Sequence, residues 1–97
     1  MPELPEVETT VRSVAPYLTG RRIRRARFSS RLVLRQDPVE AADRIEGRRI
    51  NAVRRHGKHI IAELSGGCFL TIHLGMTGKL LINGAEGPHT RAVFELD

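Results

Sequence analysis

The hydrophobic residues of the first twenty positions recur with the period of an α-helix. Four aliphatic side chains are spaced three or four residues apart, namely Val7, Val11, Val14 and Leu18. This spacing places them on one face of a helix, and Pro5 and Gly20 suit its first turn and its end. We therefore expect an amphipathic helix over residues 6–18, with Pro16 late in the segment, where it can kink the helix.

A second helix is predicted by the residues at its start. Asp37 is a suitable N-cap, Pro38 fits the first turn, and Glu40 stands where a capping box places its acid. Gly47 marks the end of this helix after Glu46, because glycine readily terminates helices.

The rest of the chain is typical of short strands joined by turns rich in glycine and serine. The predicted strands are 21–29, 31–35, 48–55, 58–64, 68–74, 79–82 and 91–96. In segment 68–74 the even-numbered residues are all apolar, whereas Phe69, Thr71 and His73 fall on the opposite face. Two helices and many short strands predict an α+β, mainly β fold, either a β-sandwich or a flattened barrel with helices at its edge.

Composition narrows the classes of function. The chain has 97 residues, enough for one small domain, and aromatic residues make up only 4%, so aliphatic side chains must form the core. The net charge is +5, and only Lys58 and Lys79 among the 16 basic residues are lysines. This charge slightly favours a polyanionic partner over a merely soluble basic surface.

Cysteine content and hydropathy exclude other classes. Cys68 is the only cysteine, which excludes an internal disulfide and a cysteine-rich metal cluster. No apolar segment reaches membrane-spanning length, and no signal-peptide pattern opens the chain. We therefore expect a cytoplasmic protein with no membrane partner.

The first residues carry the strongest candidate chemistry. Removal of Met1 would leave Pro2 as a free secondary amine beside the carboxylate of Glu3. An α-amine has a reference pKa near ~8, so it is partly uncharged near neutral pH and can attack carbon. Its condensation with an aldehyde-level carbon gives an iminium, which is a good electron sink. The simpler interpretation is a helix start, where prolines and acids are favoured on backbone and dipole grounds alone.

Three further residues are candidates for ligand contact, and each has a simpler explanation. Lys58 follows the basic run Arg54-Arg55-His56, but a lone lysine after a turn is usually solvated. His73 points away from the apolar face of its predicted strand, as many surface histidines do. Met76 lies in a glycine-flanked loop with no core to fill, where an apolar side chain can act as a wedge between stacked bases.

Three motifs, in order along the chain, resemble those of bacterial formamidopyrimidine-DNA glycosylases. They are Met1-Pro2-Glu3-Leu4-Pro5-Glu6-Val7-Glu8, Arg54-Arg55-His56-Gly57-Lys58 and Ile72-His73-Leu74-Gly75-Met76-Thr77-Gly78. The endonuclease VIII branch is similar but usually lacks the Leu-Pro-Glu-Val run. The resemblance implies a two-layered β-sandwich with two flanking helices. It also implies base-excision repair of double-stranded DNA, with removal of oxidised purines such as 8-oxoguanine and formamidopyrimidines.

The resemblance also implies roles for single residues. Pro2 attacks the sugar C1′ and forms an imine, and Glu3 acts as general acid on the ring oxygen. Lys58 donates a proton in the β-elimination that cuts the strand at an abasic site. Glu6, one helical turn from Glu3, belongs to the active-site region. Contacts to DNA are implied for His73, Met76 and His89.

Two features depart from the family pattern. Arg91 replaces the second histidine of a His-x-His motif that begins at His89, so the role of this position is open. The helix–two-turn–helix region and the four-cysteine zinc finger of these enzymes have no counterpart here. We therefore interpret residues 1–97 as the N-terminal catalytic domain of a longer enzyme that carries one structural zinc. We expect the domain to be monomeric, weak or inactive alone, and free of cofactor and metal, and we expect the protein to lie in the bacterial cytoplasm, associated with the nucleoid.

Three alternatives remain open at this point. The domain could bind damaged DNA without cutting it. It could instead belong to an endonuclease VIII-like glycosylase for oxidised pyrimidines. A basic β-domain with an unrelated partner is the third alternative, and it predicts no preference for damaged over intact duplex.

Overall fold

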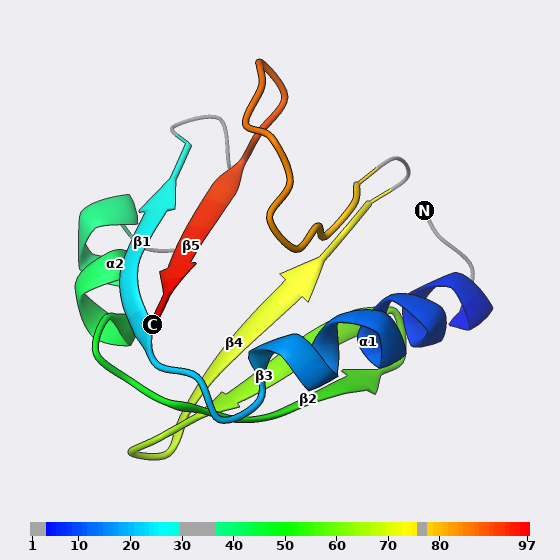
Figure 1. The fold of residues 1–97 in the computed structure, drawn as a ribbon, viewed down its shortest axis with the longest axis horizontal. Coiled ribbons are helices and arrows are strands. Elements are labelled where there is room, and N and C mark those ends of the chain that lie inside the picture. Colours follow the sequence, from blue (N-terminus) through cyan, green and yellow to red (C-terminus); the bar gives the residue numbers. More distant parts are fainter. Residues whose placement is uncertain (1–3, 30–36, 76–77) are drawn as a thin grey trace.

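The computed structural model describes residues 4–29, 37–75 and 78–97, which form two helices and five strands (Figure 1). In chain order the elements are α1 (Leu4–Leu18), β1 (Ile23–Phe28), α2 (Pro38–Ile45), β2 (Ile50–His56), β3 (His59–Leu64), β4 (Cys68–His73) and β5 (Ala92–Leu96). Both predicted helices and the α+β, mainly β class are confirmed. The predicted strand 31–35 lies outside the described residues. None of the helices in the described part of the chain has the length and apolar character needed to span a membrane.

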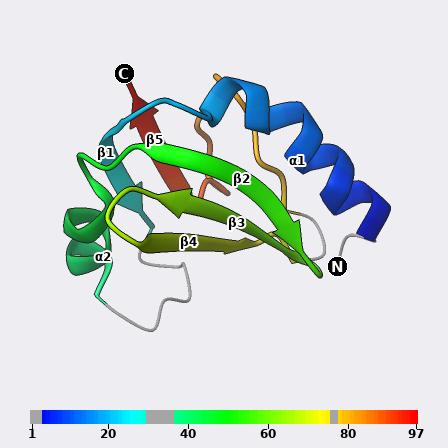
Figure 2. The ribbon, with the colours of Figure 1, turned by 90° about the horizontal axis from the view of Figure 1, so that it is seen from below.

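The strands form two antiparallel sheets. β2, β3 and β4 follow one another as a meander, whereas β5 pairs with β1 across most of the sequence. Ala26 lies opposite Phe94, and the Phe94 ring meets the Phe28 ring edge-on with centroids 5.7 Å apart. In Figure 2, α1 lies along the three-stranded sheet and α2 lies beside β1, in agreement with the contacts between these elements.

Two clusters of buried apolar side chains hold these layers together. The sheet cluster joins both sheets to α2 and contains Ile23, Ala26, Ile45, Ile50, Ala62 and Leu64. The smaller α1 cluster joins α1 to the three-stranded sheet and contains Val7, Val11 and Ile60. The buried core of the described chain consists of Val, Ile, Leu and Ala, as the low aromatic content predicts. Full burial of one Val, Leu or Ile side chain stabilises the fold by roughly 1.5–3 kcal/mol.

The helix boundaries follow the predicted signals closely. α1 begins at Leu4, two residues before the predicted start, and ends at Leu18 despite Pro16 in its last turn. The side chain of Asp37 accepts hydrogen bonds from the backbone N–H groups of Val39 and Glu40, at 2.9 and 3.2 Å. Asp37 is therefore the N-cap of α2, as predicted.

The predicted strand 79–82 is wrong, because this segment has no regular secondary structure. Its apolar residues favour a strand, but they do not alternate between a buried and an exposed face. Leu80 packs against the α1 cluster, whereas Leu81 is 63% exposed. The β2–β3 turn also differs from the prediction, since it lies one residue later, at Gly57 and Lys58.

Candidate active site and nucleic-acid interface

Lys58 lies at the tip of the hairpin formed by β2 and β3. His56 and His59 are the last paired residues of this hairpin, so Gly57 and Lys58 form a two-residue turn. Gly57 has a φ of +61°, which glycine adopts without strain at the first position of a type II′ turn. The turn holds Lys58 exposed at its second position, where the ammonium group is accessible to a ligand.

An ion pair fastens the first turns of α1 to this hairpin. Arg55 Nε donates to Glu8 Oε1 at 3.0 Å, and Arg12 Nε donates to Glu8 Oε2 at 3.1 Å. A second nitrogen of Arg55 donates to the carbonyl oxygen of Gly57 at 3.1 Å. Arg55 therefore connects the helix directly to the turn that carries Lys58.

The electrostatic environment of Glu8 defines its role. The hydrogen bond from Arg55, followed by that from Arg12, lowers the pKa of Glu8 below its ordinary value. The carboxylate is therefore ionised at neutral pH and is unsuited to act as a general acid. Sequence reasoning missed the Glu8–Arg55 pair. Only the four-residue spacing of Glu8 and Arg12 was a visible signal, because the contact with Arg55 depends on how α1 packs on β2.

Apolar packing brings a third segment to the same place. Val7 is 1% exposed and packs in the α1 cluster with Ile60, which lies near the start of β3. Ile72 and Leu74 flank His73 and pack against this cluster. The start of α1, the β2–β3 turn and the end of β4 therefore lie at one end of the molecule, as Figures 1 and 2 both show.

His73 is the last residue of β4 and faces outward, as predicted. It lies opposite His59 in the sheet, and the two imidazole rings have centroids 4.9 Å apart. Beyond His73, Gly75 has a φ of +70°. A Cβ atom on Gly78 would overlap the carbonyl oxygen of Leu74, so only glycine allows this close approach.

Three predicted site residues, Pro2, Glu3 and Met76, lie outside the described residues. Glu6 is described, and its side chain is exposed. It lines a hollow of about 400 Å³ between α1, Leu74 and residues 78–81, in which Lys79 is the other charged lining residue. The structure thus places Glu6 on the same helix end that lies against the Lys58 hairpin.

His89 belongs to a different part of the described structure. It is exposed in the loop 83–91, where the backbone N–H of Gly87 donates to the hydroxyl of Thr90 at 2.9 Å. Arg27 of β1 pairs with Glu86 of this loop at 3.0 Å. The contacts of the His89 loop therefore run to the two-stranded sheet, whereas those of His73 run to the Lys58 hairpin.

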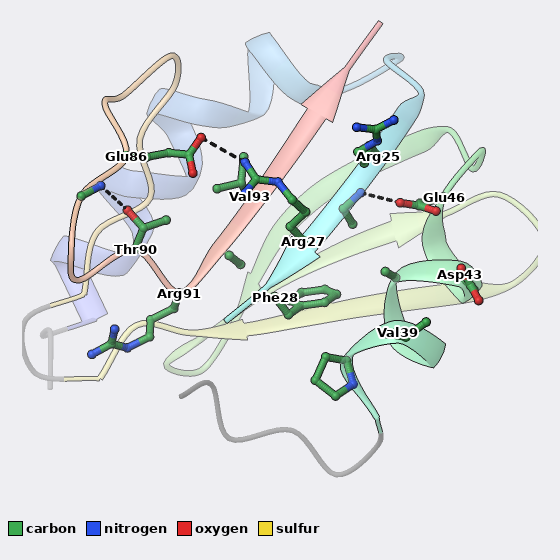
Figure 3. Close-up of a pocket in the computed structure, with 15 residues that line it drawn as sticks. Arg25, Arg27, Phe28, Val39, Asp43, Glu46, Glu86, Thr90, Arg91 and Val93 are labelled. Atoms are coloured by element: carbon green, nitrogen blue, oxygen red, sulfur yellow. Dashed lines mark hydrogen bonds and ion pairs between the residues drawn. The ribbon is translucent and has the colours of Figure 1, made fainter. Parts of the chain in front are cut away.

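A larger hollow of about 590 Å³ opens between β1, α2 and the His89 loop (Figure 3). Its charged lining residues are Arg25, Arg27, Arg91, Asp43, Glu46 and Glu86. Glu46 accepts a hydrogen bond from the backbone N–H of Ala26 at 2.8 Å, and Glu86 pairs with Arg27. Three positive and three negative side chains cancel, so this lining does not favour an anionic ligand. Lys58 and His73 are not among its lining residues.

Comparison with known proteins identifies the family of this chain. Residues 1–97, the whole chain, match the family described as the formamidopyrimidine-DNA glycosylase N-terminal domain. The chain belongs to the formamidopyrimidine-DNA glycosylase family. The formamidopyrimidine-DNA glycosylase of Solibacter usitatus is 55% identical over 98 residues, which cover 100% of this chain and 37% of that protein. The one of Carboxydothermus hydrogenoformans is 43% identical over 100 residues, which cover 99% of this chain and 38% of that protein.

Solved members of the family share the fold. The MutM (Fpg) protein of Thermus thermophilus has a TM-score of 0.83 and 41% identity, covering 99% of this chain and 34% of that one. The Lactococcus lactis Fpg, solved with DNA containing Fapy-dG, has a TM-score of 0.84 and 25% identity, covering 97% and 37%. The chain therefore spans about a third of the length of these family members. Family membership, inferred from the three motifs, is confirmed.

Proposed function

We propose that residues 1–97 form the N-terminal catalytic domain of a bifunctional glycosylase and abasic-site lyase that removes oxidised purines from DNA. The observation that carries this proposal is the convergence of the α1 start, the Lys58 turn and His73 at one end of the molecule. Pro2 precedes Leu4 by two residues. The covalent chain therefore ties Pro2 to the residue at which α1 begins, and we infer that its amine acts on the same nucleotide as Lys58.

The reaction follows from the residue types. Once Met1 is removed, the Pro2 nitrogen attacks the sugar C1′ of the damaged nucleotide, and the base leaves with the bonding electrons. Glu3 donates a proton to the ring oxygen, which opens the sugar and leaves an iminium between Pro2 and C1′. The iminium makes the C2′ hydrogen acidic, and its loss as a proton expels the 3′ phosphate by β-elimination, with Lys58 as proton donor in this step. δ-Elimination then expels the 5′ phosphate.

Two conditions must hold for this chemistry. Met1 must be absent, because an acylated proline nitrogen is a tertiary amide without nucleophilicity. Glu3 must also carry a proton before it can donate one. We propose Glu6, three residues further along the sequence, as the source of the second negative charge that this requires.

The proposed partner is double-stranded DNA that contains an oxidised purine or an abasic site. A net charge of +5 supports binding to the phosphate backbone. His73 and His89 would contact the DNA, and Met76 would fill the gap left by the extruded nucleotide. The complexes of Lactococcus lactis Fpg with lesion-containing DNA support this assignment. The match to the formamidopyrimidine branch favours oxidised purines over the pyrimidines of endonuclease VIII.

The remaining properties are part of the same proposal. The reaction needs no redox cofactor, and the structural zinc of whole family members requires four cysteines. Cys68 is the only cysteine of this chain, so residues 1–97 cannot supply that ligand set. We propose a monomer in the bacterial cytoplasm, associated with the nucleoid.

Reductive trapping tests the proposal. The whole glycosylase that carries this domain, with removal of Met1 verified by mass spectrometry, is mixed in excess with abasic-site duplex and borohydride, which reduces an imine to a stable amine. We expect a covalent adduct whose modified residue is Pro2. Pro2→Gly should greatly reduce this adduct, because it replaces the secondary amine, which gives a charged iminium directly, by a primary amine whose imine is uncharged until it is protonated.

Pro16→Ala is the matched control, since Pro16 lies in the last turn of α1, at the opposite end from Pro2. It should leave the adduct yield unchanged. Binding without any adduct would identify a damaged-DNA-binding domain without catalysis. An adduct that maps to Lys58 or another amine rather than to residue 2 would assign the imine elsewhere, and either result contradicts the proposal.

A further inference from the structure

The outer face of the three-stranded sheet carries a row of three histidines. The strand register places His56 of β2, His59 of β3 and His73 of β4 directly opposite one another. All three are exposed, and α1 packs on the other face of the sheet through the α1 cluster. Lys58 stands next to His59 in the turn. The tip of the β2–β3 hairpin and the end of β4 therefore carry four neighbouring side chains with nitrogen atoms, three imidazoles and one ammonium group.

His59 and His73 are the pair in direct contact. Their ring centroids are 4.9 Å apart, and the ring planes are inclined by 50°. If both rings took up a proton they would repel each other, and Lys58 would add to this repulsion. The neighbouring row on this face contains Arg54, Ile61 and Thr71. The carboxylate on this face, that of Glu63, lies one row further and pairs with Arg54 at 3.7 Å.

The charge balance of this tip indicates its ligand. An anion bound at the tip would relieve the repulsion between the protonated rings and stabilise their charged forms. Proton binding and anion binding would then be coupled, because each must strengthen the other by the same factor. A metal ion is a poorer match, since no group of three or more potential ligands in the described residues is arranged to hold one.

We propose that His59, together with His73 and Lys58, binds one phosphate of the DNA strand, and that this binding takes up a proton. The inference rests on the proposed function, which supplies the phosphate. It adds His59 as a DNA-binding residue, and it makes affinity depend on pH in the range where histidine changes charge. The affinity for DNA should rise as the pH falls, by up to about tenfold per pH unit for one proton taken up.

The test measures binding to a duplex that contains a tetrahydrofuran abasic analogue, which lacks the aldehyde needed for an imine. Fluorescence anisotropy at constant ionic strength gives Kd from about pH 6 to about pH 8, the range in which histidine titrates. We expect tighter binding at the lower pH. His59→Phe, which keeps a ring of similar size beside His73, should remove most of the pH dependence while changing Kd little at the higher pH.

His56→Phe is the matched control, because His56 lies in the same row of the hairpin while the observed ring contact joins His59 to His73. It should retain the pH dependence, and thermal unfolding of both variants establishes that they fold. A second measurement uses the imidazole NMR signals, and His59 and His73 should hold their protons to higher pH when the duplex is present. An unchanged pH dependence in His59→Phe, or a duplex that leaves both imidazole titrations unmoved, would overturn the inference. Because the analogue cannot form an imine, this experiment measures binding alone. Its failure can therefore be distinguished from failure of the Pro2 trapping experiment, which measures imine formation.

Discussion

At the residue scale, Glu8 links the candidate site to the fold. Its carboxylate accepts hydrogen bonds from Arg55 at 3.0 Å and from Arg12 at 3.1 Å, and Arg55 also holds the carbonyl of Gly57. The helix that begins just after the proposed nucleophile is thereby joined to the turn that bears Lys58. The contribution of Glu8 is positional, because an ionised carboxylate with two guanidinium partners does not donate protons.

The pH dependence of stability tests this role. Arg55 and Arg12 lower the pKa of Glu8 below 4.5, so its stabilising effect is complete above that value and is lost as the pH falls through the folded-state pKa. Glu8→Gln should therefore lower the Tm at neutral pH, by a small amount that salt reduces. The difference in Tm from the unmodified protein should shrink below about pH 4.5. Differential scanning calorimetry across this range measures it.

Glu95→Gln provides the comparison for this experiment, since Glu95 is exposed on β5. It should lower the Tm at neutral pH by less than Glu8→Gln does. A constant Tm difference between Glu8→Gln and the unmodified protein at every pH would show that the carboxylate charge does not fasten the helix.

Single residues also show what the sequence could reveal about the site. Lys58 and His73 were predicted as site residues from their motifs, and the structure brings their segments together. The contact of His59 with His73 was missed, because two histidines separated by thirteen other residues meet only through the register of β3 and β4. Sequence reveals such a pair only when the strand pairing is already known.

At the scale of elements, local signals predicted more than long-range ones did. The caps and apolar spacing of both helices are local, and both helices form where they indicate. The pairing of β1 with β5 depends on contacts across most of the chain and could not be derived from periodicity. Segment 79–82 shows the opposite case, in which a local signal was misleading. Its composition favours a strand, but in the structure Leu80 packs against the α1 cluster and no strand forms.

The N-cap of α2 gives a prediction at this scale. Replacing Asp37 by Ala removes the oxygen that accepts hydrogen bonds from Val39 and Glu40. We expect a loss of about 1 kcal/mol in the free energy of unfolding, or a fall in Tm of about 4–8 °C for a domain of this size. Urea unfolding measures the change, and Asp37→Asn should keep most of the stability. Equal losses in both variants would contradict the assigned cap.

At the scale of the whole molecule, the two apolar clusters have different consequences. The sheet cluster joins the layers of the fold, whereas the α1 cluster also sets where the start of α1 lies relative to the Lys58 hairpin. Damage to either cluster should lower stability. Only damage near the start of α1 should also disturb the proposed reaction geometry, because a displacement of about 1 Å can cost a hundredfold in rate.

A pair of identical substitutions in α1 tests this, since Val7 belongs to the α1 cluster and Val14 is buried outside both clusters. Val7 and Val14 are 1% and 3% exposed, and they lie about two turns apart on the same helix. Each change to Ala should lower the free energy of unfolding by about 1–3 kcal/mol through lost burial and a residual cavity. Val7→Ala should in addition slow imine trapping of abasic-site DNA at a temperature where both variants are folded, because Val7 anchors the turn that follows Pro2. Trapping rates and urea unfolding, measured on the same samples, test this difference. If both variants lose trapping in proportion to stability, the α1 cluster supports the fold but does not position the site.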